Sequence, residues 1–334
     1  MINYSEIRDV HLEMSTLCNA SCPWCPRNFW GYPFNGGYPE INLTLENAKK
    51  IFSDAFLNQL VSIRINGNFV DIVMNPDSVK IIDYFKKSNP GLMISVSTNG
   101  SGRNKDFWAR LGEENIQVSF ALDGLEDTHH LYRQNTSWKQ ILKNAKTFIS
   151  AGGVAIWKMI KFDHNLHQID QCRALSQELG FQKFELVSGG RDTAPVFDRH
   201  GNFTHALGNY HGPTEFKILF YKKQNNEVLL EDILSGRIPR QSVTCETKKL
   251  KSIYIAANGD VSPCCWTGFF PRTYGKGQYH QAANKQIADL MTKNNALLWP
   301  LEECIEWFEN IEKSWNIRDY KQGRLVICDD NCGN

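Results

Sequence analysis

The chain has 334 residues, of which 42% are hydrophobic and 22% are charged, with a formal net charge of +1. This length can bury a large core, the balanced charge gives no sign of nucleic-acid binding, and the apolar runs are too short to cross a membrane. The N-terminus lacks the charged-then-apolar pattern of a signal peptide, so the sequence predicts a cytoplasmic protein.

Strand-like and helix-like segments alternate through the first half of the chain. Helix starts are expected at Thr44, Asn75, Thr136 and Asn165, each followed by apolar residues at helical spacing. About six β/α units predict a parallel sheet with helices outside it, and function gathers in the loops after such strands. The predicted strands are 10–15, 61–65, 92–97, 117–122, 154–160 and 183–187.

The second half of the chain is less regular. No firm periodicity is present in 191–244, which predicts a linker or an irregular segment. Further on, the stretches 252–256 and 261–265 flank Asn258-Gly259, a dipeptide typical of tight β-hairpins. Helical stretches and a coil follow this hairpin. The predicted parts are therefore 1–190, 191–244 and 245–334.

The ten cysteines are clustered, and clustered thiols in a reducing compartment are typically metal ligands or catalytic groups. Three lie within eight residues near the start, and six lie between Cys245 and Cys332. The long stretch between the two groups contains only Cys172. This distribution predicts two metal centres flanking a scaffold.

Cys18, Cys22 and Cys25 are separated by gaps of three and two residues, directly after the first predicted strand. One short loop with this spacing can hold three corners of a 4Fe–4S cluster, because thiolates bind such clusters. No fourth cysteine is near, so one iron would stay open to a cofactor or substrate. A zinc loop or structural thiols are the alternative, although a closed zinc site needs a fourth ligand close by.

This triad, with Trp24 as an aromatic residue just before the last cysteine, resembles the hallmark of the radical S-adenosylmethionine (SAM) superfamily. The resemblance covers residues 8–190 and implies an α/β fold, a partial (β/α)6 barrel. In that family the open iron binds the amino and carboxylate groups of SAM. An electron from the cluster then cleaves SAM to methionine and a 5′-deoxyadenosyl radical, which abstracts a hydrogen atom from the substrate.

The resemblance also implies cofactor contacts in the loops after the next strands. Family members usually carry Gly-Gly-Glu after the second strand; this chain has Gly67 and Asn68 there, with Asp71 as a substitute for the glutamate. Later strand ends where the family often contacts the cofactor hold Ser97, Thr98, Asn99 and Asp123. An ordinary turn is the alternative at these later positions. Lys158 and Lys161 are further candidates for the barrel interior.

The second cysteine group has its own pattern. Cys245 is followed after thirteen residues by Gly259, and then after four more by Cys264. This pattern resembles the C-terminal auxiliary-cluster domains called SPASM and twitch, and the cysteines are too few for the full SPASM arrangement. The resemblance implies a twitch-like domain with a second 4Fe–4S cluster, and a zinc site is the alternative. The implied ligands are Cys245, Cys264, Cys328 and Cys332.

The remaining cysteines have other expected roles. Cys304 and Cys172 lie on apolar helical stripes, which predicts that both are core residues. Neighbouring residues of a strand point to opposite faces, so Cys264 and Cys265 are not expected to bind one cluster together. Cys265 is then buried, exchanges roles with Cys264 or donates a hydrogen atom.

By the same resemblance, an auxiliary cluster favours net oxidation or cross-linking, because it can accept an electron from a substrate radical. The preferred function is modification of a peptide by oxidation, cross-linking or epimerisation. Only seventeen residues precede Cys18, so a separate protein is expected to recognise the peptide, and flavodoxin or ferredoxin is the expected reductant. The alternatives are a small-molecule radical SAM dehydrogenase or epimerase, and an iron–sulfur or zinc protein without catalysis.

Overall fold

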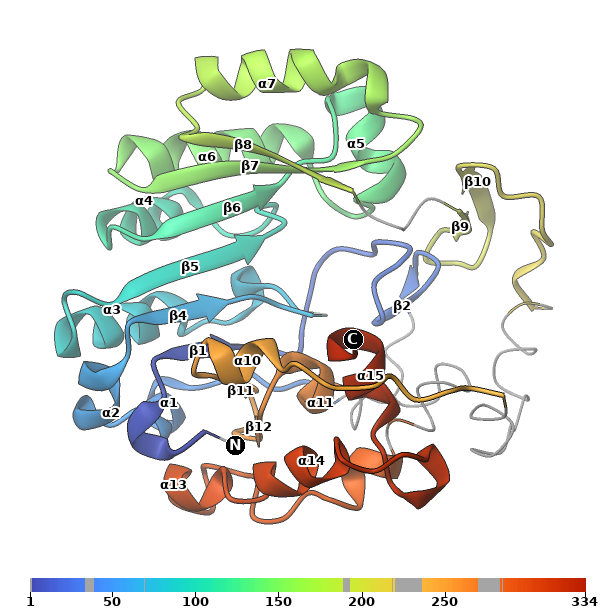
Figure 1. Cartoon of the computed structure of the whole chain (residues 1–334). Helices are drawn as coiled ribbons and strands as arrows, with labels where there is room; N and C mark the ends of the chain where they lie inside the picture. Colours follow the sequence, from blue (N-terminus) through green and yellow to red (C-terminus); the bar gives the residue numbers. More distant parts are fainter. Residues whose placement is uncertain are drawn as a thin grey trace.

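The computed structural model describes residues 2–33, 39–68, 70–188, 193–217, 219, 236–269, 283 and 285–334. One eight-stranded sheet, in the order β12-β11-β1-β4-β5-β6-β7-β8, organises these residues. Figure 1 shows its strands one above another, with helices along the outside. The central strands are β1 (Asp9–Leu12), β4 (Ser62–Ile65), β5 (Met93–Thr98), β6 (Gln117–Ala121), β7 (Val154–Lys161) and β8 (Lys183–Ser188).

These six central strands are parallel, and each pairs with the next one in chain order. Parallel neighbours need crossover connections, which helices supply here. The arrangement confirms the predicted α/β class and the partial (β/α)6 barrel. The helices of this half are η1 (Tyr4–Glu6), α1 (Leu45–Ile51), α2 (Asp54–Gln59), η2 (Ile72–Met74), α3 (Ser78–Ser88), α4 (Lys105–Glu113), α5 (Glu126–Tyr132), α6 (Trp138–Ser150), η3 (Leu166–Gln168) and α7 (Ile169–Glu178).

The main core lies between the sheet and these helices. Ile63 of β4 and Val118 of β6 are fully buried in the same apolar cluster as Phe52, Phe85 and Phe148. The ring centroids of Phe52 and Phe85 lie 4.8 Å apart. Each such side chain contributes about 1.5–3 kcal/mol when it is removed from water, so packing against the sheet holds the outer helices in place.

Local hydrogen bonds shift some predicted boundaries. Thr44 caps α1 as predicted. The helix expected to continue through Phe56 is divided instead, because Ser53 caps the separate helix α2. Asn75 does not cap α3: its side-chain amide donates to two loop carbonyls, and the helix begins three residues later. Asn165 likewise bonds to its own turn and does not cap the following helix, and α5 was not predicted.

The C-terminal hairpin continues the barrel sheet. β11 (Ser252–Ile255) pairs in parallel with β1, and β12 (Val261–Ser262) returns antiparallel to β11. The hairpin at Asn258-Gly259 is therefore present as predicted, although β12 ends before Cys264. The other described helices of this region are α10 (Glu246–Lys249), α11 (Cys265–Phe269), α13 (Leu301–Cys304), α14 (Phe308–Ser314), η5 (Tyr320–Gln322) and α15 (Val326–Cys332).

The segment expected to be a linker contains a second hairpin, β9 (Ala194–Phe197) and β10 (Phe203–Leu207). It packs against the loop after β1, where β2 (Asn28–Phe29) and β3 (Tyr32–Pro33) form a short antiparallel pair. The Phe197 N–H donates to the Trp30 carbonyl at 2.8 Å. Sequence periodicity missed this hairpin because its strands are short.

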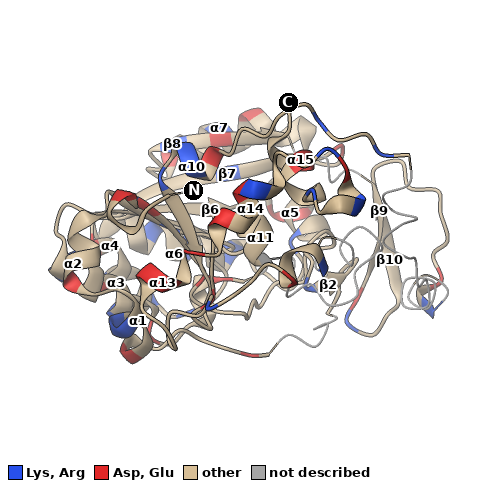
Figure 2. Cartoon of the chain, turned by 60° about the horizontal axis from the view of Figure 1, so that its bottom comes forward, with Lys and Arg blue, Asp and Glu red and all other residues tan. Residues whose placement is uncertain are grey.

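In Figure 2, the positions of Lys and Arg (blue) are interspersed with those of Asp and Glu (red) along the ribbon, and the net charge of the chain is +1. Charges of mixed sign give no electrostatic argument for a nucleic-acid partner. Among the described residues, no helix combines the length and apolar character that crossing a membrane requires.

Candidate active site

The first cysteine triad lies in the loop that follows β1. The Ser21 N–H donates to the Gln134 carbonyl at 3.0 Å, which ties this loop to the end of α5. The Cys25 N–H donates to the Cys22 carbonyl at 3.0 Å, which closes a turn between the last two cysteines. As a result, Cys18, Cys22 and Cys25 all face one cavity of about 400 Å³.

The cavity walls come from the carboxyl ends of the barrel strands, where parallel βα folds place function. The predicted SAM-contacting residues that line it are Gly67, Asn68, Asp71, Ser97, Thr98 and Asn99. Further lining residues include Trp24, Tyr132, Arg133, Lys158 and Ser188. The structure therefore brings together most of the predicted site, including the candidate Lys158, and adds Arg133 to it.

Asp71 organises the strand-end residues. Its buried carboxylate accepts hydrogen bonds from Thr98 Oγ1 at 2.6 Å, the Asn99 N–H at 2.6 Å and Asn99 Nδ2 at 2.8 Å. The Val73 N–H also donates to it, at 3.1 Å. Burial raises the pKa of Asp71, although these hydrogen bonds oppose the change. Its evident part is to hold Thr98 and Asn99 in place, and a direct contact with SAM stays a prediction.

Gly67 and Asn68 form the wall after β4. A Cβ at position 67 would lie 2.1 Å from the Val70 carbonyl oxygen, so the turn requires glycine. The Asn68 N–H donates to the Glu13 carboxylate at 2.9 Å, and Asn68 Nδ2 is buried without a hydrogen-bond partner among the described residues. The side-chain N–H group of Asn68, a residue that lines the cavity, is therefore a candidate hydrogen-bond donor to a ligand. Glu13, which directly follows β1, was not predicted, and its one sequence signal is the alternation of polar residues at positions 9, 11 and 13.

Arg133 brings a buried positive charge to the cavity. Its Nε donates to Asp123 Oδ2 at 2.6 Å, and its Nη1 donates to Cys22 Sγ at 3.7 Å. Burial alone would lower the pKa of Arg133, but Asp123 and Cys22 raise it. Asp123 therefore lies behind Arg133 and does not line the cavity, and a contact between Asp123 and SAM stays a prediction. No motif marks Arg133, which follows the unpredicted helix α5.

Burial also governs ionisation within the triad. It raises the pKa of Cys18 well above that of a free thiol, and it raises the pKa of Cys22 to about 11, although Arg133 opposes the second change. Both thiols are thus neutral near pH 7 without a bound cation. Iron deprotonates coordinating thiols outright. Three cysteines outside any disulfide, together with the unpartnered Asn68 amide, fit a cluster with one open iron and its cofactor.

The second cysteine group also meets in one place. A small cavity of about 20 Å³ is lined by the four cysteines that the sequence analysis selected. Its other lining residues are mostly apolar and include Val243, Pro263, Ile311 and Trp315. The cysteines in this lining are Cys245, Cys264, Cys328 and Cys332. Their convergence agrees with the predicted ligand set, and their role as ligands stays a prediction.

Local structure explains this convergence. Helix α15 places Cys328 and Cys332 one turn apart on the same face. The chain after Cys332 pairs back, since the Thr244 N–H donates to the Cys332 carbonyl at 2.8 Å, which sets Cys245 beside Cys332. A hydrogen bond between these two thiols lowers the pKa of Cys245 to about 6 and raises the pKa of Cys332.

Across the described ranges, no three His, Cys, Asp or Glu residues form a group that could hold a single metal ion. A 4Fe–4S cluster, which binds each thiolate at a different iron, stays the predicted occupant of this second site, with zinc as the alternative. Burial raises the pKa of Cys328, and a hydrogen bond from the Trp315 side chain to this thiol opposes that change.

The remaining cysteines lie outside both cavities. Cys304 and Cys172 are completely buried in the main core, as predicted. Cys265 begins α11, and neither described cavity lining includes it. The expectation that Cys264 and Cys265 point to opposite faces of a strand was wrong in its premise, because the strand ends at Ser262.

Residues 12–161, from the end of β1 to the end of β7, match the radical SAM superfamily. This range contains the cysteine triad and most of the first cavity. The chain thus contains a radical SAM domain over these residues, and it is an enzyme.

Solved structures with the same fold extend the comparison beyond the matched range. Streptococcus suis SuiB bound to S-adenosylmethionine has a TM-score of 0.58 at 16% identity, and the match covers 98% of this chain and 73% of SuiB. Native anSMEcpe with bound AdoMet has a TM-score of 0.54 at 15% identity, covering 97% of this chain and 89% of anSMEcpe. These likenesses show that the fold is shared into the C-terminal region.

A curated relative is the cysteine-type anaerobic sulfatase-maturating enzyme of Clostridium novyi (strain NT). It is 26% identical to this chain over 145 residues, which is 40% of this chain. The match spans 37% of the length of that relative.

Proposed function

We propose that this chain binds SAM and a 4Fe–4S cluster at the first cavity and uses them to modify a peptide. When bound, the two cofactors supply a one-electron cleavage of SAM that yields a 5′-deoxyadenosyl radical able to take a hydrogen atom from the substrate. The observation that carries the proposal is the convergence of Cys18, Cys22 and Cys25 on one cavity walled by strand ends.

The surrounding residues would bind and orient SAM. Arg133 is placed to bind a carboxylate, because a guanidinium has five N–H donors and its described contacts with Asp123 and Cys22 use Nε and Nη1. Asn68 Nδ2 offers a further donor to the cofactor. Ser97 and Thr98 line the same cavity and would contact the remaining part of SAM. Trp24 also lines it and is 43% exposed, so a substrate that enters the cavity would cover this side chain.

The second cavity would hold an auxiliary 4Fe–4S cluster. Its four cysteines would occupy all four irons, so this cluster would serve electron transfer and not substrate binding. The mostly apolar lining supports that reading, since it offers a substrate few polar groups to bind. An electron acceptor of this kind favours oxidation or cross-linking over epimerisation.

Relatives support a peptide as the substrate. One solved SuiB is bound to the precursor peptide SuiA, with a TM-score of 0.57 at 15% identity, and one solved anSMEcpe is bound to AdoMet and the Cp18Cys peptide. A separate recognition protein and a flavodoxin or ferredoxin reductant would complete the system. The reduced thiols that metal binding requires favour a cytoplasmic location.

The central test is anaerobic reconstitution of the wild type and of the variant with Cys18→Ala, Cys22→Ala and Cys25→Ala. The wild type should bind about eight irons, and the variant should bind about four and form no 5′-deoxyadenosine with a strong reductant. Cys172→Ala, which removes a thiol outside both cavities, is the matched control and should behave as the wild type. Unchanged SAM cleavage by the triple variant would refute the proposal.

The substrate class needs its own experiment. Peptides encoded beside the gene should be incubated with the reduced enzyme and SAM, and a mass change should appear with 5′-deoxyadenosine formation. A change in small molecules alone would favour the small-molecule dehydrogenase or epimerase.

A further inference from the structure

A buried ion pair lies next to the auxiliary cavity. The side chains of Arg324 and Asp329 are 3% and 0% exposed, and Arg324 Nη2 donates to Asp329 Oδ1 at 2.5 Å. Arg324 Nε donates to the same oxygen at 2.9 Å. Removing both charges from water is costly, and apolar residues of similar size often stabilise a core at least as well. Stability alone therefore gives a weak account of this pair.

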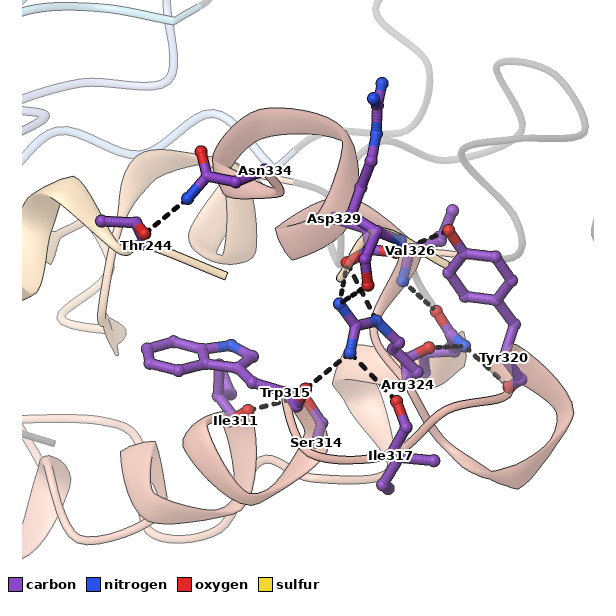
Figure 3. Close-up of polar contacts among 12 residues, drawn as sticks. Thr244, Ile311, Ser314, Trp315, Ile317, Tyr320, Arg324, Val326, Asp329 and Asn334 are labelled. Carbon is purple, nitrogen blue, oxygen red and sulfur yellow. Dashed lines mark hydrogen bonds and ion pairs between the residues drawn. The ribbon is translucent and has the colours of Figure 1, made fainter. Parts of the chain in front are cut away.

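Arg324 connects segments that are distant in the sequence. Its Nη1 donates to the carbonyls of Trp315 and Ile317, at 2.5 and 3.0 Å, and its Nη2 donates to the Arg240 carbonyl at 2.9 Å. Figure 3 shows the guanidinium between Asp329 and the carbonyls of Trp315 and Ile317. A planar guanidinium fixes the directions of its partners, which the point charge of a lysine does not do.

Asp329 completes the network from the helix side. Its Oδ2 accepts the Tyr320 hydroxyl at 2.7 Å and the Arg240 N–H at 2.9 Å. Its backbone carbonyl accepts the Gly333 N–H at 2.9 Å, at the end of α15. The carboxylate is thus held by three different parts of the C-terminal region.

Each segment that this hydrogen-bond network connects contains, or leads to, residues that line the auxiliary cavity. Asp329 lies between Cys328 and Cys332 on α15, and Trp315 lines the cavity itself. Arg240 begins the extended stretch that leads to Cys245, and this stretch pairs with the chain end through the bridge between 243 and 333. The ion pair therefore contacts the segments that contain three of the four cysteines.

We propose that the Arg324–Asp329 pair is a positioning device that brings Cys245, Cys328 and Cys332 toward Cys264 before iron arrives. The inference rests on the auxiliary cluster of the proposed function and adds the residues that form its site in advance. Thiols on independently moving segments would have to be ordered by the cluster, at the expense of its binding free energy. A pre-organised site avoids that cost.

The experiment compares Asp329→Asn with Asp330→Asn as its matched control. Asp330 is the next residue of α15, and it pairs with Arg237 at 2.8 Å in a half-exposed position. The control removes the same charge from the same helix and leaves the buried network intact. Iron and sulfide per chain, SAM cleavage, and the alkylation rate of each cysteine in the iron-free protein are measured.

Asp330→Asn should keep about eight irons, and Asp329→Asn should keep about four while still cleaving SAM at the first site. In the iron-free protein, Cys328 and Cys332 of Asp329→Asn should be alkylated faster than in the wild type. If Asp329→Asn does not fold, Tyr320→Phe decides the matter, because it removes one hydrogen bond and little volume. Its auxiliary irons should pass to a chelator about tenfold faster.

Asp329→Asn with about eight irons and wild-type alkylation rates would overturn the positioning role. Tyr320→Phe that releases iron at the wild-type rate would overturn it too. A wild-type protein that binds about four irons would instead refute the auxiliary cluster of the proposed function, so the two failures are distinguishable.

Discussion

Replacing His129 with asparagine should make the stability of the protein less sensitive to acid. The Asp123 N–H donates to His129 Nδ1 at 3.2 Å, and His129 Nε2 lies 3.0 Å from Thr136 Oγ1. The ring is therefore neutral, with an acceptor at Nδ1, and burial lowers its pKa to about 4. Asparagine can still accept from the Asp123 N–H through its side-chain oxygen, but it does not titrate.

The sign of the effect follows from the two pKa values. The folded-state pKa of about 4 lies below the unfolded value of about 6.5, so unfolding takes up a proton between these limits. The stabilisation is present above about pH 6.5 and is lost as the pH falls toward 4. Between pH 7 and pH 5 the contribution of His129 to the free energy of unfolding falls by about 2 kcal/mol. Near pH 5 this contribution changes by about 1 kcal/mol per pH unit.

The assay is urea unfolding of the iron-free protein at several pH values from 7 to 5, for the wild type and His129→Asn. The slope of unfolding free energy against pH should be shallower in the variant by about 1 kcal/mol per pH unit, while carboxylate titrations affect both proteins equally. Equal slopes would refute the argument, because the histidine would then bind its proton equally well in both states.

Asp71→Asn should destabilise the protein by about 3 kcal/mol in urea unfolding and weaken SAM binding, because the buried carboxylate accepts several hydrogen bonds that an amide cannot all replace. Asp77→Asn, which removes a surface partner of Lys80, should stay within about 0.5 kcal/mol of the wild type, and equal losses in both variants would contradict this account. Cys304→Ala should leave the iron content unchanged and cost about 1–2 kcal/mol, as for a truncated core residue. A loss of about four irons would make Cys304 a cluster ligand.

The fold and the cysteine sites could be predicted because they depend on local patterns. Strand and helix periodicity marked the six barrel units, and short spacings marked the triad and the hairpin before Cys264. Arg133 and Arg324 could not be found in this way, since each acts through partners that only the folded chain brings near. Arg133 contacts Cys22 across 111 positions, and Arg324 donates to the Arg240 carbonyl across 84. No short sequence motif predicts contacts between residues so far apart in the chain.

Sequence patterns also left the place of the C-terminal hairpin undefined. The Asn258-Gly259 turn predicts that β11 and β12 pair with each other, and nothing local specifies that β11 also pairs with β1. That partnership depends on matching register, with Asp9 opposite Ser252 and Leu12 opposite Ile255. Isolated hairpins are marginal in water, so the hairpin gains from joining the larger sheet.

The pairing of β1 with β11 also has a consequence for how the chain folds during synthesis. Asp9 and Ser252 are 243 positions apart, yet they hydrogen-bond across this pair of strands. Until the ribosome has released β11, one edge of β1 has exposed N–H and C=O groups, and open edges of this kind invite pairing with other chains. The cysteine loop directly follows β1, so the edge that supports it is completed only late in translation. A fragment that ends before β11 would therefore aggregate through β1, even though it contains the whole triad.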